Sequence, residues 1–98
     1  MSPQASELAT PSQQLQQAVQ ALGDYAHVVV HRQRGHLVVY AGDQEPVARL
    51  TPLPEARYGL SFYRHDGRWE RMPFTGTISA MASTLLDTLG PYLAQAKL

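Results

Sequence analysis

The 98-residue chain contains no cysteine. This absence excludes a disulfide-stapled scaffold, a thiolate nucleophile and any zinc site built on cysteine ligands. The chain also lacks long apolar runs: the longest, at residues 25–30, is interrupted by His27. A membrane-spanning helix needs about 20 apolar residues, so we expect no membrane association. The N-terminal residues do not resemble a secretory signal either, and we expect a cytoplasmic protein.

Charged residues are few, and they are unevenly placed. Only 16% of the residues are charged, and the formal net charge is zero. Every arginine and every histidine lies between His27 and Phe74, whereas the one lysine, Lys97, lies outside that segment with three of the acids. The middle of the chain is therefore mildly basic and its ends are mildly acidic. This imbalance is far weaker than the basic footprint of a dedicated nucleic-acid-binding protein.

Length and composition favour one folded domain. A chain of this size, with 44% hydrophobic residues, can bury a modest core but not two independent ones. We expect residues 1–9 to be a flexible N-terminus, because they are small and polar. Residues 10–98 are then expected to form a single α+β domain.

Residues 11–22 have the signals of a first helix. Thr10 and Gln13 match a capping box, and Pro11 occupies the first helical position. Gly23 stands where a left-handed residue would end the helix. Apolar residues follow at helical spacing: Leu15, Ala18, Val19 and Leu22.

A second helix is predicted near the C-terminus. Gly76 should end the preceding strand, and Thr77 can cap the helix that follows. The apolar positions repeat at helical spacing: Ile78, Met81, Ala82, Leu85 and Leu89. Pro91 lacks an N–H and its ring clashes with the preceding turn, so we expect the helix to kink or restart there.

Between the helices, short apolar segments alternate with turn residues. The predicted strands are residues 26–32, 36–41, 46–51, 57–64 and 69–74. Their connections are too short for parallel crossovers, so neighbouring strands should pair antiparallel. The predicted fold is therefore α+β: an N-terminal helix, an antiparallel β-meander of 4–5 strands and a C-terminal helix, with both helices on one sheet face. Whether 46–51 pairs as a regular strand stays open, because prolines follow it closely.

The last hairpin allows two registers. A two-residue loop at Asp66 and Gly67 would turn Met72 and Phe74 away from the apolar residues of the preceding strand. A three-residue loop, with Gly67 in the left-handed conformation, shifts the pairing by one residue. We choose this second register because it unites the apolar side chains on one face. That face comprises Tyr58, Leu60, Phe62, Met72 and Phe74.

No motif for catalysis or cofactor binding occurs in the chain. There is no glycine-rich phosphate loop, no nucleophile elbow and no pair of carboxylates suited to acid–base chemistry. We therefore expect no cofactor, and an enzymatic role is the less favoured alternative, because small domains without such motifs seldom assemble a catalytic site.

The histidines are weak candidates for a metal site. His31 and His36 would face each other if the first hairpin loop comprised residues 32–35. Two histidines provide only half of a metal site, and no cysteine or carboxylate accompanies them. Surface or cross-strand histidines are the favoured interpretation. A small ligand-binding or metal-binding protein that uses this pair is a lesser hypothesis.

The sheet face opposite to the helices is the favoured candidate for a binding surface. In the chosen register Tyr63 and Trp69 point to this face, and the full set of binding-face candidates is Arg49, Tyr63, His65, Trp69 and Arg71. Aromatic rings accompanied by arginine are enriched at binding surfaces. Such a face could be a subunit interface, a stacking platform for single-stranded nucleic acid, or a region buried by curling of the sheet.

These observations lead to one main functional hypothesis and one principal alternative. The main hypothesis is a small non-enzymatic interaction module, homodimeric through its sheet or its C-terminal helix, or bound to a protein partner that the sequence does not identify. The alternative is weak single-stranded nucleic-acid binding through the aromatic and arginine residues of the open sheet face.

Overall fold

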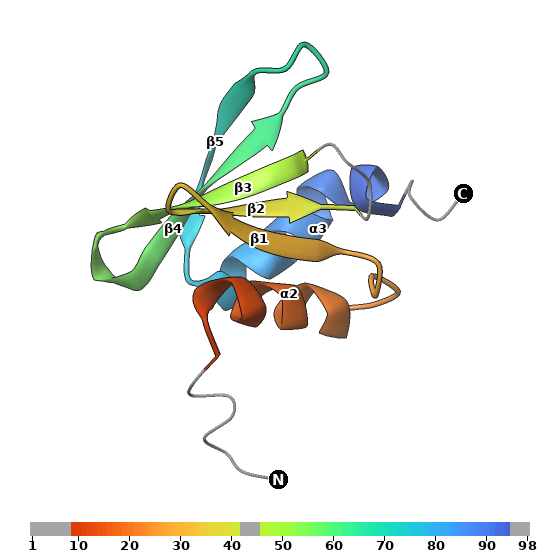
Figure 1. Ribbon diagram of the computed structural model, residues 1–98, viewed down its shortest axis with the longest axis horizontal. Coiled ribbons are helices and arrows are strands. Elements are labelled where there is room, and N and C mark those ends of the chain that lie inside the picture. The colour runs from red at the N-terminus through yellow and green to blue at the C-terminus, as the bar shows by residue number, and fades with distance from the viewer. Residues whose placement is uncertain (1–8, 42–45, 95–98) are drawn as a thin grey trace, which may run out of the picture.

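The computed structural model describes residues 9–41 and 46–94. Along the chain, a helix is followed by five strands and a second helix (Figure 1). The elements are α2 (Pro11–Ala21), β1 (Val29–Gln33), β2 (His36–Tyr40), β3 (Pro46–Leu53), the short turn η1 (Pro54–Ala56), β4 (Arg57–Tyr63), β5 (Trp69–Gly76) and α3 (Ile78–Ala94). The strands pair in the order β1-β2-β3-β4-β5, and every pair is antiparallel. The predicted α+β meander is therefore confirmed.

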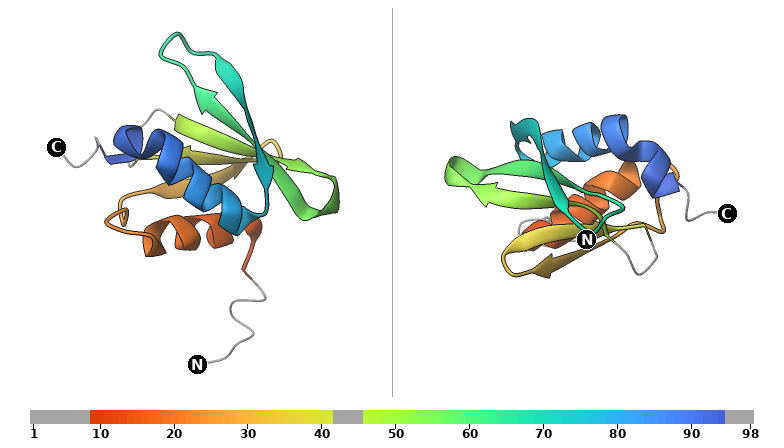
Figure 2. Two further views of the ribbon diagram at one scale, coloured as in Figure 1. Left: turned by 180° about the vertical axis from the view of Figure 1, so that it is seen from behind. Right: turned by 90° about the horizontal axis from the view of Figure 1, so that it is seen from above.

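Both helices pack on the same face of the sheet. α2 contacts β1 and α3, whereas α3 contacts β3, β4 and β5, and Figure 2 shows the two helices together on one side of the strands. The core between these layers is formed by buried aliphatic side chains from every layer: Leu15, Val19, Val28, Val30, Leu37, Val39, Leu50, Leu60, Met81, Leu85, Leu89 and Leu93. Within the part of the chain that the structure describes, neither helix is long and apolar enough to cross a membrane.

The capping box of α2 forms as predicted. The Gln13 N–H donates to Thr10 Oγ1 at 3.3 Å, and the Thr10 N–H donates to Gln13 Oε1 at 3.0 Å. The predicted left-handed cap at Gly23 is wrong, because the helix ends at Leu22 in the right-handed conformation. The Leu22 N–H donates to the Val19 carbonyl at 3.1 Å. This tighter bond closes the last turn, so no left-handed residue is needed.

The N-cap of α3 is also confirmed, since Thr77 Oγ1 accepts from the Ala80 N–H at 3.2 Å. The predicted restart at Pro91 is not observed, because α3 is continuous from Ile78 to Ala94. Proline removes only one hydrogen bond of the helix, to the carbonyl of residue 87. Burial of Leu89 and Leu93 on either side of it keeps this turn on the core.

The strand boundaries differ from the prediction by one to three residues, most at the start of β1 and at the ends of β3 and β5. β1 begins at Val29 rather than at residue 26, because the Val28 N–H donates to the Tyr25 carbonyl at 3.0 Å and closes a turn there. β3 is regular and longer than predicted, ending at Leu53. β3 pairs with β2 only as far as Leu50, so at Pro52 the strand has one paired neighbour, β4. The N–H group that proline lacks is therefore not required for pairing on the other side.

The last hairpin has the predicted three-residue loop. Gly67 is left-handed with φ +85, its N–H donates to the Arg64 carbonyl at 3.0 Å, and Tyr63 pairs with Trp69. A bulge between Gly59 and Ser61 then inserts extra residues in β5. The apolar grouping survives the bulge: Leu60 is buried, and Tyr58, Phe62, Met72 and Phe74 pack against the core.

Candidate binding face of the sheet

The face of the sheet away from the helices, called the open face below, has side chains in rows that cross the strands. Directly paired residues in an antiparallel sheet point to the same side. The register therefore defines an arginine row of His31, Val38, Arg49, Ser61 and Arg71, one residue from each strand. Two positions further along the strands, an aromatic row contains Val29 and Tyr40 on β1 and β2, and Tyr63 and Trp69 on β4 and β5.

Three of the predicted binding residues meet on this face, near the end of the β4–β5 hairpin. The guanidinium carbon of Arg49 lies 4.4 Å from the ring centre of Trp69. The rings of Tyr63 and Trp69 meet edge to face, with centroids 4.9 Å apart. To reach Trp69 from β3, the side chain of Arg49 crosses β4 next to Ser61, which is only 8% exposed. A small residue at this position leaves room for the arginine to pass.

Among residues 9–41 and 46–94, no acidic side chain pairs with Arg49. Its Nε atom is buried and makes no hydrogen bond. Leaving such an atom without an acceptor costs free energy, about 1–3 kcal/mol for a neutral group and more for a charged one. The stacking contact with Trp69 offsets only part of this cost, since cation–π attraction contributes about 0.5–2 kcal/mol. The guanidinium is thus positioned by packing rather than by a carboxylate.

Among the described residues, no carboxylate neutralises the positive charge of the open face. Glu70 is the one acid within the five strands, and it pairs with Phe62 on the helix side. Arg71, exposed on β5, lies in the same row as Arg49, and Arg57 donates to Thr75 Oγ1 at 2.6 Å on the neighbouring row. The face therefore combines arginines with aromatic rings and attracts anions.

His36 senses this positive charge. Its Nδ1 lies 3.0 Å from Thr51 Oγ1 across the β2–β3 pair. Burial, and second the charge of Arg49, lower the pKa of His36 below its ordinary value. The imidazole is consequently neutral at physiological pH, and the fixed cations of the face are its arginines.

The predicted His31–His36 pair does not form. The first hairpin has a two-residue loop, Arg34 and Gly35, both with positive φ, which places His31 opposite Val38 and His36 opposite Gln33. The pairing of the two histidines required a loop of four residues, 32–35. The two-residue loop forms instead because Arg34 adopts the left-handed conformation, which is uncommon for arginine. Within residues 9–41 and 46–94, no group of three or more metal-ligating side chains comes together.

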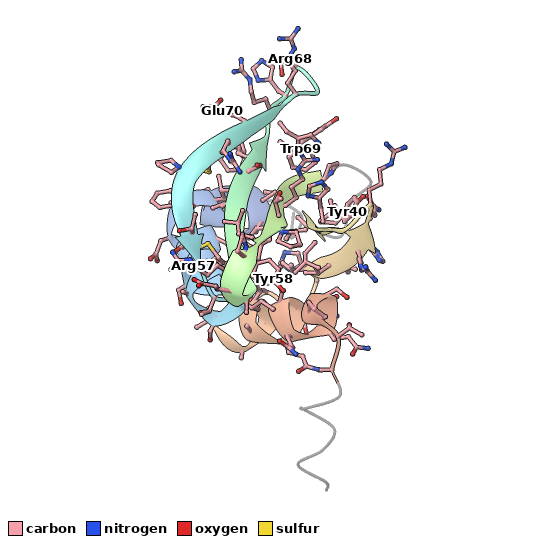
Figure 3. All side chains as sticks on the ribbon, turned by 90° about the vertical axis from the view of Figure 1, so that its left-hand side faces the viewer. Tyr40, Arg57, Tyr58, Arg68, Trp69 and Glu70 are labelled. Atoms are coloured by element: carbon pink, nitrogen blue, oxygen red, sulfur yellow. The ribbon has the colours of Figure 1, made fainter. Side chains whose placement is uncertain are left out.

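Tyr40 is a member of the face that the sequence reading missed. It contacts the His31 ring edge to face at 5.6 Å, and its hydroxyl is hydrogen-bonded to Gln33. Figure 3 shows Tyr40 and Trp69 on the side of the sheet opposite to α3. With a two-residue loop in the first hairpin, the alternation of side chains along β2 predicts that Tyr40 points to the open face.

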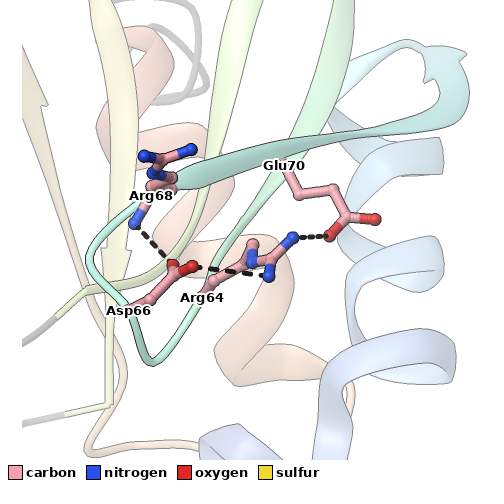
Figure 4. Close-up of polar contacts among 4 residues, drawn as sticks. All are labelled: Arg64, Asp66, Arg68 and Glu70. Atoms are coloured by element: carbon pink, nitrogen blue, oxygen red, sulfur yellow. Dashed lines mark hydrogen bonds and ion pairs between the residues drawn. The ribbon is translucent and has the colours of Figure 1, made fainter.

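The tip of the β4–β5 hairpin lies apart from this cluster. His65 is exposed in the loop and contacts none of the other candidates in the described structure. Arg64 bridges two acids, Asp66 at 3.4 Å and Glu70 at 3.3 Å, and the Arg68 N–H donates to Asp66 (Figure 4). The tip is therefore locally charge-balanced, in contrast to the open face.

Comparison with known proteins identifies no relative. No protein family model matches the chain, and no curated protein or solved structure matches it. The function proposed below therefore rests on the residues of the open face.

Proposed function

We propose that this protein is a small non-enzymatic binding module that holds an anionic partner on its open face. The observation that carries the proposal is Arg49, stacked on Trp69 with a buried Nε that lacks an acceptor. A guanidinium already held in one orientation loses little conformational freedom when it binds a carboxylate or phosphate. Arg71 and Arg57 add further donors on the same face.

A second copy of the chain is a poorer occupant of this face. In a twofold-symmetric dimer the same patch meets itself, so the arginines of one copy would face the arginine-bearing patch of the other. Like charges brought together without acids between them oppose association. Charge complementarity therefore favours a dissimilar, anionic partner.

Self-association through the helices is the second candidate. Leu22 and Tyr92 are the large apolar side chains with the most exposure in the described chain, at 51% and 48%. They lie near the C-terminal ends of α2 and α3. A dimer formed there would cover both side chains and leave the open face free. Light scattering at tens of micromolar protein tests this candidate, and a monomeric mass would remove it.

The binding proposal is tested with two anionic probes, inorganic polyphosphate and polyglutamate, by calorimetric titration at low salt. Arg49→Gln should weaken binding of at least one probe by about tenfold, since a charge-assisted hydrogen bond contributes about 1.5–3 kcal/mol. The matched control is Arg32→Gln, because Arg32 is exposed but pairs with Leu37 on the helix side. Failure of both probes to bind, or equal losses in the two variants, would overturn the proposal.

A further inference from the structure

We infer that the anionic partner is a single-stranded nucleic acid that crosses the strands of the open face, with phosphates along the arginine row and bases along the aromatic row. This inference rests on the proposed function and specifies its ligand. The two rows are two residues apart on β1, β2, β4 and β5, whereas β3 contributes no residue to the aromatic row and its pairing with β2 shifts beside Tyr40. That spacing is about 7 Å along a strand, comparable with the reach from a backbone phosphate to its own base.

The aromatic row supplies the contacts that nucleobases use. Tyr63 and Trp69 form one edge-to-face pair on β4 and β5, and Tyr40 stands on β2, two strands away. All three rings are half-buried, so each is fixed in place and still partly accessible. Stacking on such rings tolerates any base, because every base has a π face.

Arg49 joins the two rows. It starts in the arginine row and places its guanidinium over Trp69. Its guanidinium carbon lies over the indole, and no other ring in the described structure contacts Arg49. Bases stack on arginine planes as they do on aromatic rings. Arg49 can therefore accept a base on the side of its guanidinium away from the indole or donate to a phosphate from its terminal nitrogens.

The arrangement favours a single strand over the two other anionic polymers. An acidic polypeptide would pair with Arg49 and Arg71 but would leave the aromatic row without a specific role. A duplex keeps its bases stacked on each other, so they are not free to lie on Tyr40 or Trp69. Only a single strand uses both rows at once.

The number of cations predicts the salt dependence. Arg49, Arg57 and Arg71 are the arginines on the open face in the described strands. For single strands, the logarithm of the binding constant falls with the logarithm of salt concentration with a slope of about −0.7 per phosphate neutralised. Phosphate contacts to Arg49 and Arg71 in the arginine row, and to Arg57 four residues further along β4 from Ser61, predict a slope of about −2. Such a slope describes a modest, salt-sensitive interaction.

The experiment uses the full chain and a 12-nucleotide oligothymidylate, followed by the fluorescence of Trp69, which is the only tryptophan. Fluorescence anisotropy of a labelled oligonucleotide provides a second readout for variants without Trp69. Blunt duplex of the same length, inorganic polyphosphate and polyglutamate are the comparison ligands. We expect quenching of Trp69 by the single strand, binding tighter than to each comparison ligand, and a salt slope near −2.

Two aromatic substitutions separate stacking from charge. Tyr40→Ala should weaken oligothymidylate binding about fivefold or more while leaving polyphosphate binding unchanged. Trp69→Ala should weaken binding of both ligands, because it also removes the ring that holds the Arg49 guanidinium. If Trp69→Ala perturbs the fold of the β4–β5 hairpin, the result for Tyr40→Ala still tests whether bases stack on the aromatic row. Tyr92→Ala is the matched control, because Tyr92 is 48% exposed and contacts Phe62 on the helix side. It should bind the oligonucleotide as the unmodified protein does.

The outcomes distinguish the inference from the function on which it rests. If polyphosphate binds through Arg49 and the oligonucleotide binds no better, the inference fails and the proposed function stands. Tighter binding of polyglutamate would identify an acidic polypeptide instead. Equal binding of duplex and single strand would exclude base stacking. If no anion binds at low salt, both proposals are overturned.

Discussion

Arg49 and Ser61 illustrate how a single pair of neighbours on adjacent strands can define a surface. Ser61 is buried beside Arg49 on β4, and the long arginine side chain passes it to reach Trp69 on β5. A larger residue at position 61 would occupy that path. The aromatic contact also orders a side chain that would otherwise lose about 2 kcal/mol of rotamer entropy when it is immobilised by a ligand.

His36 should make the stability of the protein depend on pH. Burial and the charge of Arg49 lower the pKa of His36 in the folded state. At pH values between this lowered pKa and the ordinary pKa, the unfolded state therefore binds more protons than the folded state. This contribution to stability is therefore present at neutral pH and is lost as pH falls through the ordinary histidine range. The variant His36→Gln retains a polar partner for Thr51. When the pH is lowered from about 7.5 to about 5.5, its free energy of unfolding should fall less than that of the unmodified protein.

Urea unfolding at several pH values measures this effect. His65→Gln is the control, because His65 is exposed in the hairpin loop and its side chain makes no hydrogen bond, ion pair or ring contact in the described structure. Its pH dependence should follow that of the unmodified protein. If the His36 and His65 variants show the same pH dependence, His36 is not the group responsible.

At the scale of the elements, α2 does more than cover the core. The Val30 N–H, on the outer side of edge strand β1, donates to Gln16 Oε1 at 2.9 Å. Gln20 Nε2 donates to the carbonyls of Ala26 and Val28 at 3.3 and 3.0 Å. Exposed edge strands invite pairing with other chains, so these glutamines satisfy groups that would otherwise be available for aggregation.

Gln16→Ala should destabilise the fold by about 1 kcal/mol or more, because the Val30 N–H loses its acceptor. The control is Gln17→Ala, an exposed position on the same helix that makes no hydrogen bond in the described structure. Both substitutions raise helix propensity equally, so their difference isolates the lost bond. Urea unfolding gives the stability difference, and amide exchange at Val30 should accelerate in the Gln16 variant alone.

At the scale of the whole molecule, the core and the open face use separate residues. The core cluster joins both helices to the inner side of the sheet, whereas Val38 is buried on the open face outside that cluster. Residues of the open face can therefore be changed with little effect on the helix–sheet packing. This separation is what makes the binding variants informative.

Leu85→Ala tests where the stability resides. Leu85 is 0% exposed on α3, so its truncation should cost about 2–5 kcal/mol, a large share of the roughly 5–15 kcal/mol of a typical domain. Leu22→Ala is the matched control, because Leu22 is 51% exposed and its truncation should change stability by about 0.5 kcal/mol or less. Equal effects in urea unfolding would contradict the position of the core.

The sequence by itself determined the features that depend on neighbours a few residues apart. The capping box at Thr10 and Gln13, the N-cap at Thr77, the order of the strands and the three-residue loop at Gly67 all follow from local hydrogen bonds, turn conformations and apolar alternation. A local signal failed at Gly23, where a hydrogen bond from Leu22 to Val19 closed the helix without a left-handed residue.

Only the tertiary structure decided which side chains meet on the open face. The contact between Arg49 and Trp69 depends on the pairing of β3, β4 and β5, and Tyr40 joins the face across a further strand pair. Two register shifts, beside Tyr40 and at Gly59, interrupt these ladders. A slip of one residue turns a strand's side chains to the opposite face, so errors accumulate with each pairing. The sequence alone therefore placed Arg49, Tyr63 and Trp69 among the candidates for this face, but it did not predict the contact between Arg49 and Trp69.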